Sequence, residues 1–172
     1  MNSPKKENYP IYMAPDGENF RGVNAVRVLD REKKYTIDKV IKAGYDTYLA
    51  FFEKLVPALV SAYDKSNNDS LKNNIKDAVA IMKAWDFHSG EKSIATTLAV
   101  TWGQQLMRDI NTISRNENDD IVSKTNLFAS NENNATVLLN TFNNAVASLN
   151  KKYGTWNAEW GTINRFQSCL LY

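Results

Sequence analysis

Residues 15–27, Pro-Asp-Gly-Glu-Asn-Phe-Arg-Gly-Val-Asn-Ala-Val-Arg, form the segment around which we expect the chain to be organised. Proline fixes φ and glycine adopts left-handed conformations readily, so the start of this segment predicts a turn. The remainder predicts the first turns of a helix, with Val23, Val26 and Arg27 on one side. The side chains in this segment with the clearest functional potential are two arginines, Arg21 at the N-terminus of the expected helix and Arg27 inside it.

The composition indicates a globular protein. Hydrophobic residues make up 43% and charged residues 23% of the 172-residue chain, which is long enough for one domain with a real hydrophobic core. The formal net charge is only +2, from 21 basic and 19 acidic residues, and it provides no electrostatic footprint for nucleic acid. We therefore expect no nucleic-acid partner.

Single copies of cysteine and histidine limit the possible chemistry. Cys169 and His88 are alone in their residue types, so an internal disulfide and a metal site built from several cysteines or histidines are excluded. We expect neither a metal nor another cofactor. The apolar run Leu55–Ala62 is too short to span a bilayer, and the polar N-terminus lacks the apolar core of a signal peptide.

Hydrophobic periodicity predicts a mainly α fold. We expect a single irregular helical domain over residues 1–172, with about five helices between residues 19 and 154. An extended arm is expected over residues 1–18, because three of the four prolines lie there. An extended tail is expected over residues 155–172, which are rich in aromatic residues and show no helical period.

The first two helices have recognisable boundaries. A first helix should run from about Asn19 to Arg31. Thr36 is the expected N-cap of the second. Proline removes a backbone hydrogen bond and clashes one turn back, so we expect a kink or break between Phe52 and Pro57.

The later helices are bounded by capping residues. Asp69 and Ser93 are expected to begin two helices, and Ser130 to begin the last, which Gly154 should end. A polar stretch over residues 116–120 is expected to be mobile, and a short helix is possible over residues 121–128. The apolar faces of the two longest helices are Leu98, Trp102, Leu106, Ile110 and Ile113, and Leu138, Phe142, Ala145 and Leu149.

Several side chains have both a structural and a functional interpretation. His88 is interpreted as a helix C-terminal cap or surface residue rather than a general base, since no nucleophile is indicated nearby. At helical spacing, Trp85 and Trp102 are expected in the core rather than in a ligand pocket. Trp156 and Trp160 are expected to cover a neighbouring surface.

Arg21 is the strongest candidate for a functional residue. At a loop-to-helix junction, its guanidinium can present a rigid fork of donors to a carboxylate or a developing oxyanion. Composition alone favours a surface salt bridge instead. The residues leave both interpretations open.

A series of short segments resembles the β-chain of the penicillin acylase family, which includes acyl-homoserine-lactone acylases. The resemblance extends over nearly the whole chain, because the segments occur in the family's order. They are residues 10–28, 35–38, 55–59, 84–86, 99–102, 153–156 and 160–167.

The resemblance implies an N-terminal-nucleophile hydrolase of linear acyl-amide bonds, such as those of penicillin-type antibiotics or acyl-homoserine lactones. In this family an N-terminal serine attacks the amide with its own α-amino group as base. Arg21 falls where the family has a supporting arginine, which would hold the oxyanion-hole asparagine and the amino group of the nucleophile. The substrate-binding residues stay unassigned.

The resemblance also leads us to expect a fragment. The sequence begins with Met1 rather than with a catalytic serine, so the chain alone is expected to be inert. Its expected partner is the remainder of the acylase α- and β-chains. The parent enzyme would be periplasmic. The alternative is a free-standing helical module that binds a protein or ligand without catalysis. An apolar face left exposed would also allow a homodimer.

Overall fold

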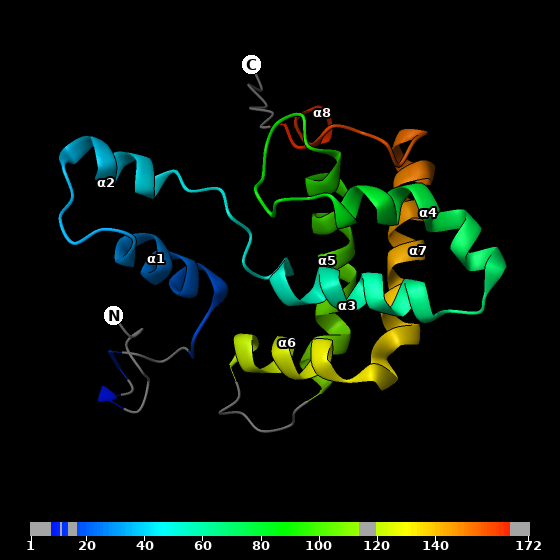
Figure 1. Ribbon diagram of the computed structural model, residues 1–172, viewed down its shortest axis with the longest axis horizontal. Helices are drawn as coiled ribbons and strands as arrows, with labels where there is room; N and C mark the ends of the chain where they lie inside the picture. Colours follow the sequence, from blue (N-terminus) through cyan, green and yellow to red (C-terminus); the bar gives the residue numbers. More distant parts are fainter. Residues whose placement is uncertain (1–7, 11, 14–16, 114–119, 166–172) are drawn as a thin grey trace, which may run out of the picture.

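The computed structural model describes residues 8–10, 12–13, 17–113 and 120–165. These residues form eight α-helices and no β-strand, which confirms the mainly α prediction (Figure 1). There are more helices than the expected five or so, because one predicted helix is divided in two and two short helices are added. They are α1 (Phe20–Asp30), α2 (Ile37–Gly44), α3 (Phe52–Lys65), α4 (Asp69–Lys83), α5 (Ile94–Thr112), α6 (Ile121–Ser130), the 3₁₀ turn η2 (Glu132–Asn134), α7 (Ala135–Tyr153) and α8 (Trp160–Ile163).

The hydrophobic core lies between α3, α4, α5, α6 and α7. The two longest helices, α5 and α7, pack against each other at its centre, and the shorter helices cross them (Figure 1). Trp102 and Phe142 are both fully buried and meet edge to face, with ring centroids 5.6 Å apart. The indole Nε1 of Trp102 donates to Thr141 Oγ1 at 3.0 Å, so the polar atom of this buried ring has a partner.

Local capping chemistry sets most of the helix ends. The side chains of Asn19, Thr36 and Ser93 each accept a hydrogen bond from a backbone N–H in the first turn of α1, α2 and α5. Gly154 ends α7 in the left-handed conformation, with φ of 77°. Thr36, Ser93 and Gly154 are caps as the sequence predicts, whereas for α1 the sequence predicted only an approximate start at Asn19.

The break expected between Phe52 and Pro57 is in the wrong place. Pro57 lies inside α3, in its second turn. The predicted long helix is instead interrupted before Phe52, between the end of α2 and the start of α3. Here Leu49 donates to the Phe87 carbonyl at 2.8 Å and Ser89 donates to the Thr47 carbonyl at 2.9 Å. This antiparallel pairing with a distant segment separates the two helices, while the buried face of α3 offsets the hydrogen bond that Pro57 cannot make.

Two predicted N-caps are also wrong. Asn68, not Asp69, caps α4, because its side chain accepts from Leu71 N at 3.1 Å. Ser130 is the last residue of α6 rather than the cap of the final helix. Its hydroxyl donates backward to the Leu127 carbonyl at 3.1 Å, and η2 intervenes before α7 begins. Asn68 thus takes the capping role predicted for its neighbour Asp69, whereas Asn134, the residue before α7, makes no side-chain capping hydrogen bond.

The segments around residue 120 and at the C-terminal side add two short helices. The possible helix over residues 121–128 is present as α6, capped by Asp120, while residues 116–119 lie outside the described residues. The tail is not extended throughout, because Trp160–Ile163 form α8. Gly161 N donates to the Glu91 carbonyl at 2.7 Å, and a Cβ at Gly161 would lie 2.3 Å from Glu91 Cγ. This close approach fixes the turn and could not be recognised from helical periodicity.

Helices α1 and α2 lie outside the core. They project from the body in a hairpin (Figure 1), and none of their residues belongs to the main buried cluster. The segment from residue 15 is therefore not the centre of the fold, which is occupied by α5 and α7; Pro15 and Asp16 lie outside the described residues. Apart from Val28, the apolar residues of the hairpin are partly buried or exposed, so they cannot organise a core.

Candidate functional site

Arg21 lies at the rim of a cleft between the α1–α2 hairpin and the start of α3. The cleft has a volume of about 730 Å³. On its α1 side, Phe20 meets Phe51 edge to face with ring centroids 5.2 Å apart. Arg21 is exposed and forms no ion pair with any other described residue.

Asp46 fixes the hairpin at the back of this cleft. Its Oδ1 accepts from Asn24 Nδ2 at 2.9 Å and from Tyr48 N at 3.1 Å, and its Oδ2 accepts from Arg31 at 3.1 Å. Only 10% of its side chain is exposed. The carboxylate therefore connects α1 to the segment that precedes α3.

The same contacts determine the protonation of Asp46. The hydrogen bond from Asn24 lowers the pKa of the Asp46 carboxyl most, and the Tyr48 N–H and Arg31 lower it further, against the opposing effect of burial. An ionised carboxylate held by three donors is a poor general base. We interpret Asp46 as a positioning residue.

Arg27, the second arginine of the segment 15–27, forms an ion pair with Glu53. Arg27 donates to Glu53 Oε2 at 2.8 Å, joining α1 to α3, and the two side chains are 47% and 34% exposed. Beside them, burial raises the pKa of the Tyr48 hydroxyl, and the Glu53 carboxylate raises it further. The salt-bridge interpretation that composition favoured for Arg21 thus applies to Arg27.

His88 is a surface residue as expected, but it does not cap α4. That helix ends at Lys83, and the imidazole Nδ1 instead lies 3.3 Å from Thr47 Oγ1. The ring also meets Tyr48 edge to face at 5.3 Å. The preceding residue, Phe87, has a φ of 65°, a strained conformation that the pairing of residues 47–49 with 87–89 holds in place.

Among the described residues that line the cleft, Arg21 carries a cationic group and Thr47 and Ser89 carry hydroxyls. Arg21 could receive a carboxylate or an oxyanion. The hydroxyl–imidazole pair of Thr47 and His88 is exposed, and no acidic side chain among the described residues is hydrogen-bonded to the other imidazole nitrogen. The described residues also contain no group of three potential metal ligands. Among the described residues, the cleft thus places one exposed guanidinium beside largely apolar side chains.

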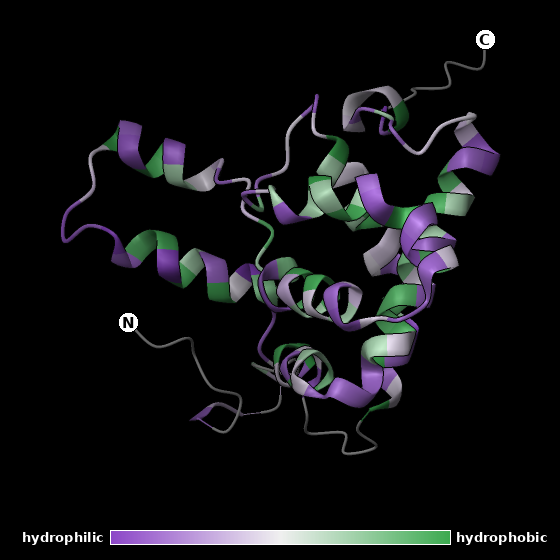
Figure 2. Ribbon diagram, turned by 45° about the vertical axis from the view of Figure 1, so that its right-hand side comes forward, coloured by the Kyte–Doolittle hydropathy of each residue, from purple (hydrophilic) through white to green (hydrophobic). Residues whose placement is uncertain are grey.

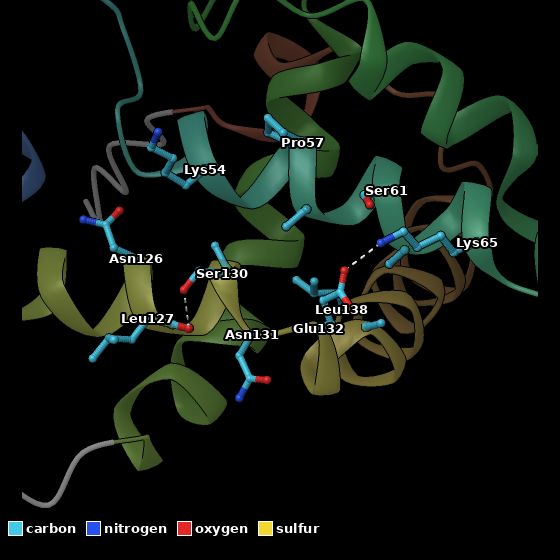
Figure 3. Close-up of a pocket in the computed structure, with 14 residues that line it drawn as sticks. Lys54, Pro57, Ser61, Lys65, Asn126, Leu127, Ser130, Asn131, Glu132 and Leu138 are labelled. Atoms are coloured by element: carbon cyan, nitrogen blue, oxygen red, sulfur yellow. Dashed lines mark hydrogen bonds and ion pairs between the residues drawn. The ribbon is translucent and has the colours of Figure 1, made fainter.

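A second cleft lies between α3, α6, η2 and α7, on the other face of α3. Figure 3 shows it as a groove with Lys54 and Asn126 near one end and the Lys65–Glu132 ion pair at the other. Lys65 Nζ donates to Glu132 Oε1 at 2.7 Å, which lowers the pKa of the Glu132 carboxyl. The cavity volume is about 780 Å³.

Small side chains make this groove hollow. Its apolar surface comes largely from alanines and a proline on facing helices, namely Pro57, Ala58, Ala62, Ala129 and Ala135. The sequence analysis did not identify it, because the helix ends at residues 130–135 were misplaced. Ala58 and Ala62, which lie one turn apart on α3, were the one available signal.

The tryptophans are distributed largely as predicted. Trp85 and Trp102 are buried in the core, with 9% and 0% of their surface exposed. Trp156 packs against the core from the segment after α7, as expected of a residue covering a neighbouring surface. Trp160 lines a smaller recess between α5, α7 and α8, and α8 lies apart from α1 in the fold (Figure 1).

Comparison with known proteins gives one match. The model of the penicillin amidase family matches residues 1–170 of this chain. No curated protein and no solved structure matches the chain. Because the family model covers nearly all of the sequence, the chain belongs to the penicillin amidase family.

Proposed function

We propose that this chain is the helical part of an amidohydrolase that cleaves linear acyl-amide bonds by N-terminal-nucleophile chemistry. The observation that carries the proposal is the family match over residues 1–170. The class of substrate is an amide joining an apolar acyl group to an amine, as in penicillin-type antibiotics or acyl-homoserine lactones. The apolar cleft beside Arg21 is consistent with such an acyl group.

Arg21 is proposed as a supporting residue of the reaction rather than the nucleophile. Its exposed guanidinium at the cleft rim has no competing carboxylate among the described residues. A fork of donors in that position can hold an asparagine side chain and the amino group of a serine nucleophile in place. The hydrogen bonds to Asp46 would fix the helix that carries Arg21.

The serine nucleophile is proposed to come from another part of the enzyme. Among the described residues no serine is paired with a base, so this part alone would not hydrolyse amides. The remainder of the acylase α- and β-chains would be its partner. By analogy with the family, the parent enzyme would act in the periplasm. None of the described helices is long and apolar enough to cross a membrane.

The test is hydrolysis of a panel of chromogenic aromatic and aliphatic acyl-amides. The chain would be assayed alone and within a longer polypeptide that carries the N-terminal-serine region of the family ahead of it. We expect activity only in the longer, self-cleaved form, and its loss on Arg21→Ala but not on Lys76→Ala, an exposed residue of α4. Full activity of Arg21→Ala would refute the role of Arg21, and activity of the chain alone would refute the assignment of the nucleophile.

A helical binding module is the second candidate. It is favoured by a core that closes among α3–α7 and by the groove between α3, α6 and α7 (Figure 3). On this alternative the chain would bind apolar acyl-amides or peptides without turnover. Binding of an uncleaved fluorescent acyl-amide, abolished by Ala58→Trp in the groove and unaffected by Arg21→Ala, would support the module over the hydrolase.

A further inference from the structure

One face of α2 exposes large apolar side chains. Ile37, Val40, Ile41 and Tyr45 have 80%, 51%, 53% and 80% of their surface exposed. Their spacing of three and four residues places them on one side of the helix. No residue of α2 is buried. We call these four residues the α2 stripe, and Figure 2 shows the projecting hairpin on which it lies.

The described contacts of α2 are on its other side. Lys39, about half a turn from the centre of the stripe, forms an ion pair with Glu32 in the α1–α2 loop. Ala43 is the one partly buried residue of the helix and faces the Arg21 cleft. The hairpin is thus attached through one side of α2, with Ile37, Val40 and Ile41 exposed on the other side, while Tyr45 at the C-terminal end of the stripe also lines the Arg21 cleft. An apolar stripe of this kind on a projecting element indicates an interaction surface.

The charges beside the stripe identify its occupant. Asp38 and Lys42 are one turn apart, on the same edge of the stripe, and neither forms an ion pair with another described residue. When two identical helices pack antiparallel about a twofold axis, the same edge of each helix meets. Asp38 then faces Lys42 of the partner subunit, and Lys42 faces Asp38 of the partner subunit. The edge is complementary to itself.

We propose that the α2 stripe binds a second copy of this chain in an antiparallel, twofold-symmetric helix pair. The four apolar residues of each copy form the centre of the interface, and the two Asp38–Lys42 pairs form one edge. Gly44 lies within the apolar face, and an added Cβ there would meet nothing within 4 Å, so the two backbones can approach closely. The inference does not depend on the proposed hydrolase activity.

The size of the surface determines how strong this dimer is. The stripe consists of four side chains, three on the eight-residue helix α2 and one on its C-cap residue Tyr45, so the interface falls below the roughly 1,200 Å² of total buried area that marks standard stable complexes. We therefore expect a reversible dimer. Its dissociation is measurable by sedimentation velocity between about 1 μM and 1 mM protein, the range appropriate to weak interfaces.

The first test removes the apolar contact. Ile41→Asp should raise the dissociation constant by roughly tenfold or more, since it places a charge in the centre of the interface. The matched control is Leu127→Asp on α6, where the leucine is 54% exposed but lies away from the stripe. This control should dimerise like the natural chain. Circular dichroism would verify that both variants keep their helices.

The second test reverses the charges on the edge. Asp38→Lys places like charges opposite each other at both ends and should weaken the dimer several-fold. Asp38→Lys combined with Lys42→Asp restores the opposite pairing and should return the dissociation constant to within about twofold of the natural value. Sedimentation would be repeated at low and high salt, because screening should weaken both the repulsion in the single variant and the attraction in the natural chain, so that their dissociation constants converge.

Each result decides the inference. Concentration-dependent dimerisation that Ile41→Asp weakens and the double reversal restores would confirm the antiparallel pair. A monomer at every concentration would overturn it and would mean that a different partner covers the stripe. A dimer that is insensitive to both positions, or one that the double reversal does not restore, would overturn the proposed geometry.

Discussion

Replacing Asp46 by asparagine tests how the hairpin that carries Arg21 is held. The substitution keeps the size of the side chain and removes its charge. Asp46 accepts hydrogen bonds from Asn24, Tyr48 N and Arg31 at 2.9, 3.1 and 3.1 Å. In the variant one amide oxygen can still accept two of them, but the amide nitrogen faces the donors of Arg31. The contact with Arg31 is therefore lost.

The expected cost follows from these three bonds. A hydrogen bond to a charged group contributes about 1.5–3 kcal/mol and one between neutral groups about 0.5–1.5 kcal/mol, so weakening two bonds costs roughly 2 kcal/mol. Arg31 is 57% exposed, and its ion pair adds at most about 1 kcal/mol. The total of roughly 2–3 kcal/mol corresponds to a 30- to 150-fold shift toward the detached hairpin.

Amide hydrogen exchange resolved along the chain is the appropriate assay, because the hairpin can open without global unfolding. Asp46→Asn should speed exchange in α1 and leave exchange in α5 and α7 nearly unchanged. Asp77→Asn, on an exposed position of α4, is the matched control and should change neither. Equal protection of α1 in the natural chain and in Asp46→Asn would refute the role of the carboxylate.

The pH dependence provides a second readout on the same residue. The pKa of Asp46 is lower in the folded protein, so its contribution is fully present above the usual carboxyl pKa of about 4 and is lost as the pH falls through the lowered value. Protection of α1 should accordingly decline in acid in the natural chain. In Asp46→Asn that decline should be absent, and its persistence would assign the acid effect to another carboxyl.

Three further substitutions test the body of the protein. Leu106→Ala, at a fully buried position of α5, should destabilise the fold by about 2–5 kcal/mol in urea unfolding, whereas Leu127→Ala, 54% exposed, should have little effect; equal losses would contradict the assigned core. Gly154→Ala should lower stability by about 1–2 kcal/mol, because φ there is 77°, and Gly90→Ala, without positive φ, should not. Lys65→Ala should leave the Tm unchanged, since its ion pair with Glu132 is highly exposed; a large drop would show that the pair contributes more than its exposure allows.

The sequence predicted the parts of the fold that depend on local chemistry. The predicted caps at Thr36, Ser93 and Gly154 are satisfied by side chains or backbone conformations within one helical turn. The predicted N-caps of α4 and of the last long helix were wrong, because neighbouring residues at these helix starts have similar capping chemistry. Adjacent residues of similar capping chemistry displaced the predicted start of α4, and the last predicted helix begins after η2 rather than after Ser130.

The candidate site was only partly visible in the sequence. Arg21 could be identified from its place at a helix start and from the family resemblance. Asp46 could not, because its partners are distant in sequence, 22 residues away at Asn24 and 15 at Arg31, and no motif connects them. The groove of Figure 3 was also missed, since it forms only where small side chains of separate helices face each other.

The amino-acid sequence by itself determined the mainly α class, the apolar faces of the longest helices and the family to which the chain belongs. Helical periodicity and capping are short-range properties, so they can be recognised one segment at a time. Only the tertiary structure decided that residues 47–49 pair with residues 87–89, that Pro57 is tolerated inside α3, and that the stripe on α2 faces outward. Each of these depends on contacts between distant segments, whose free energy outweighs local preference.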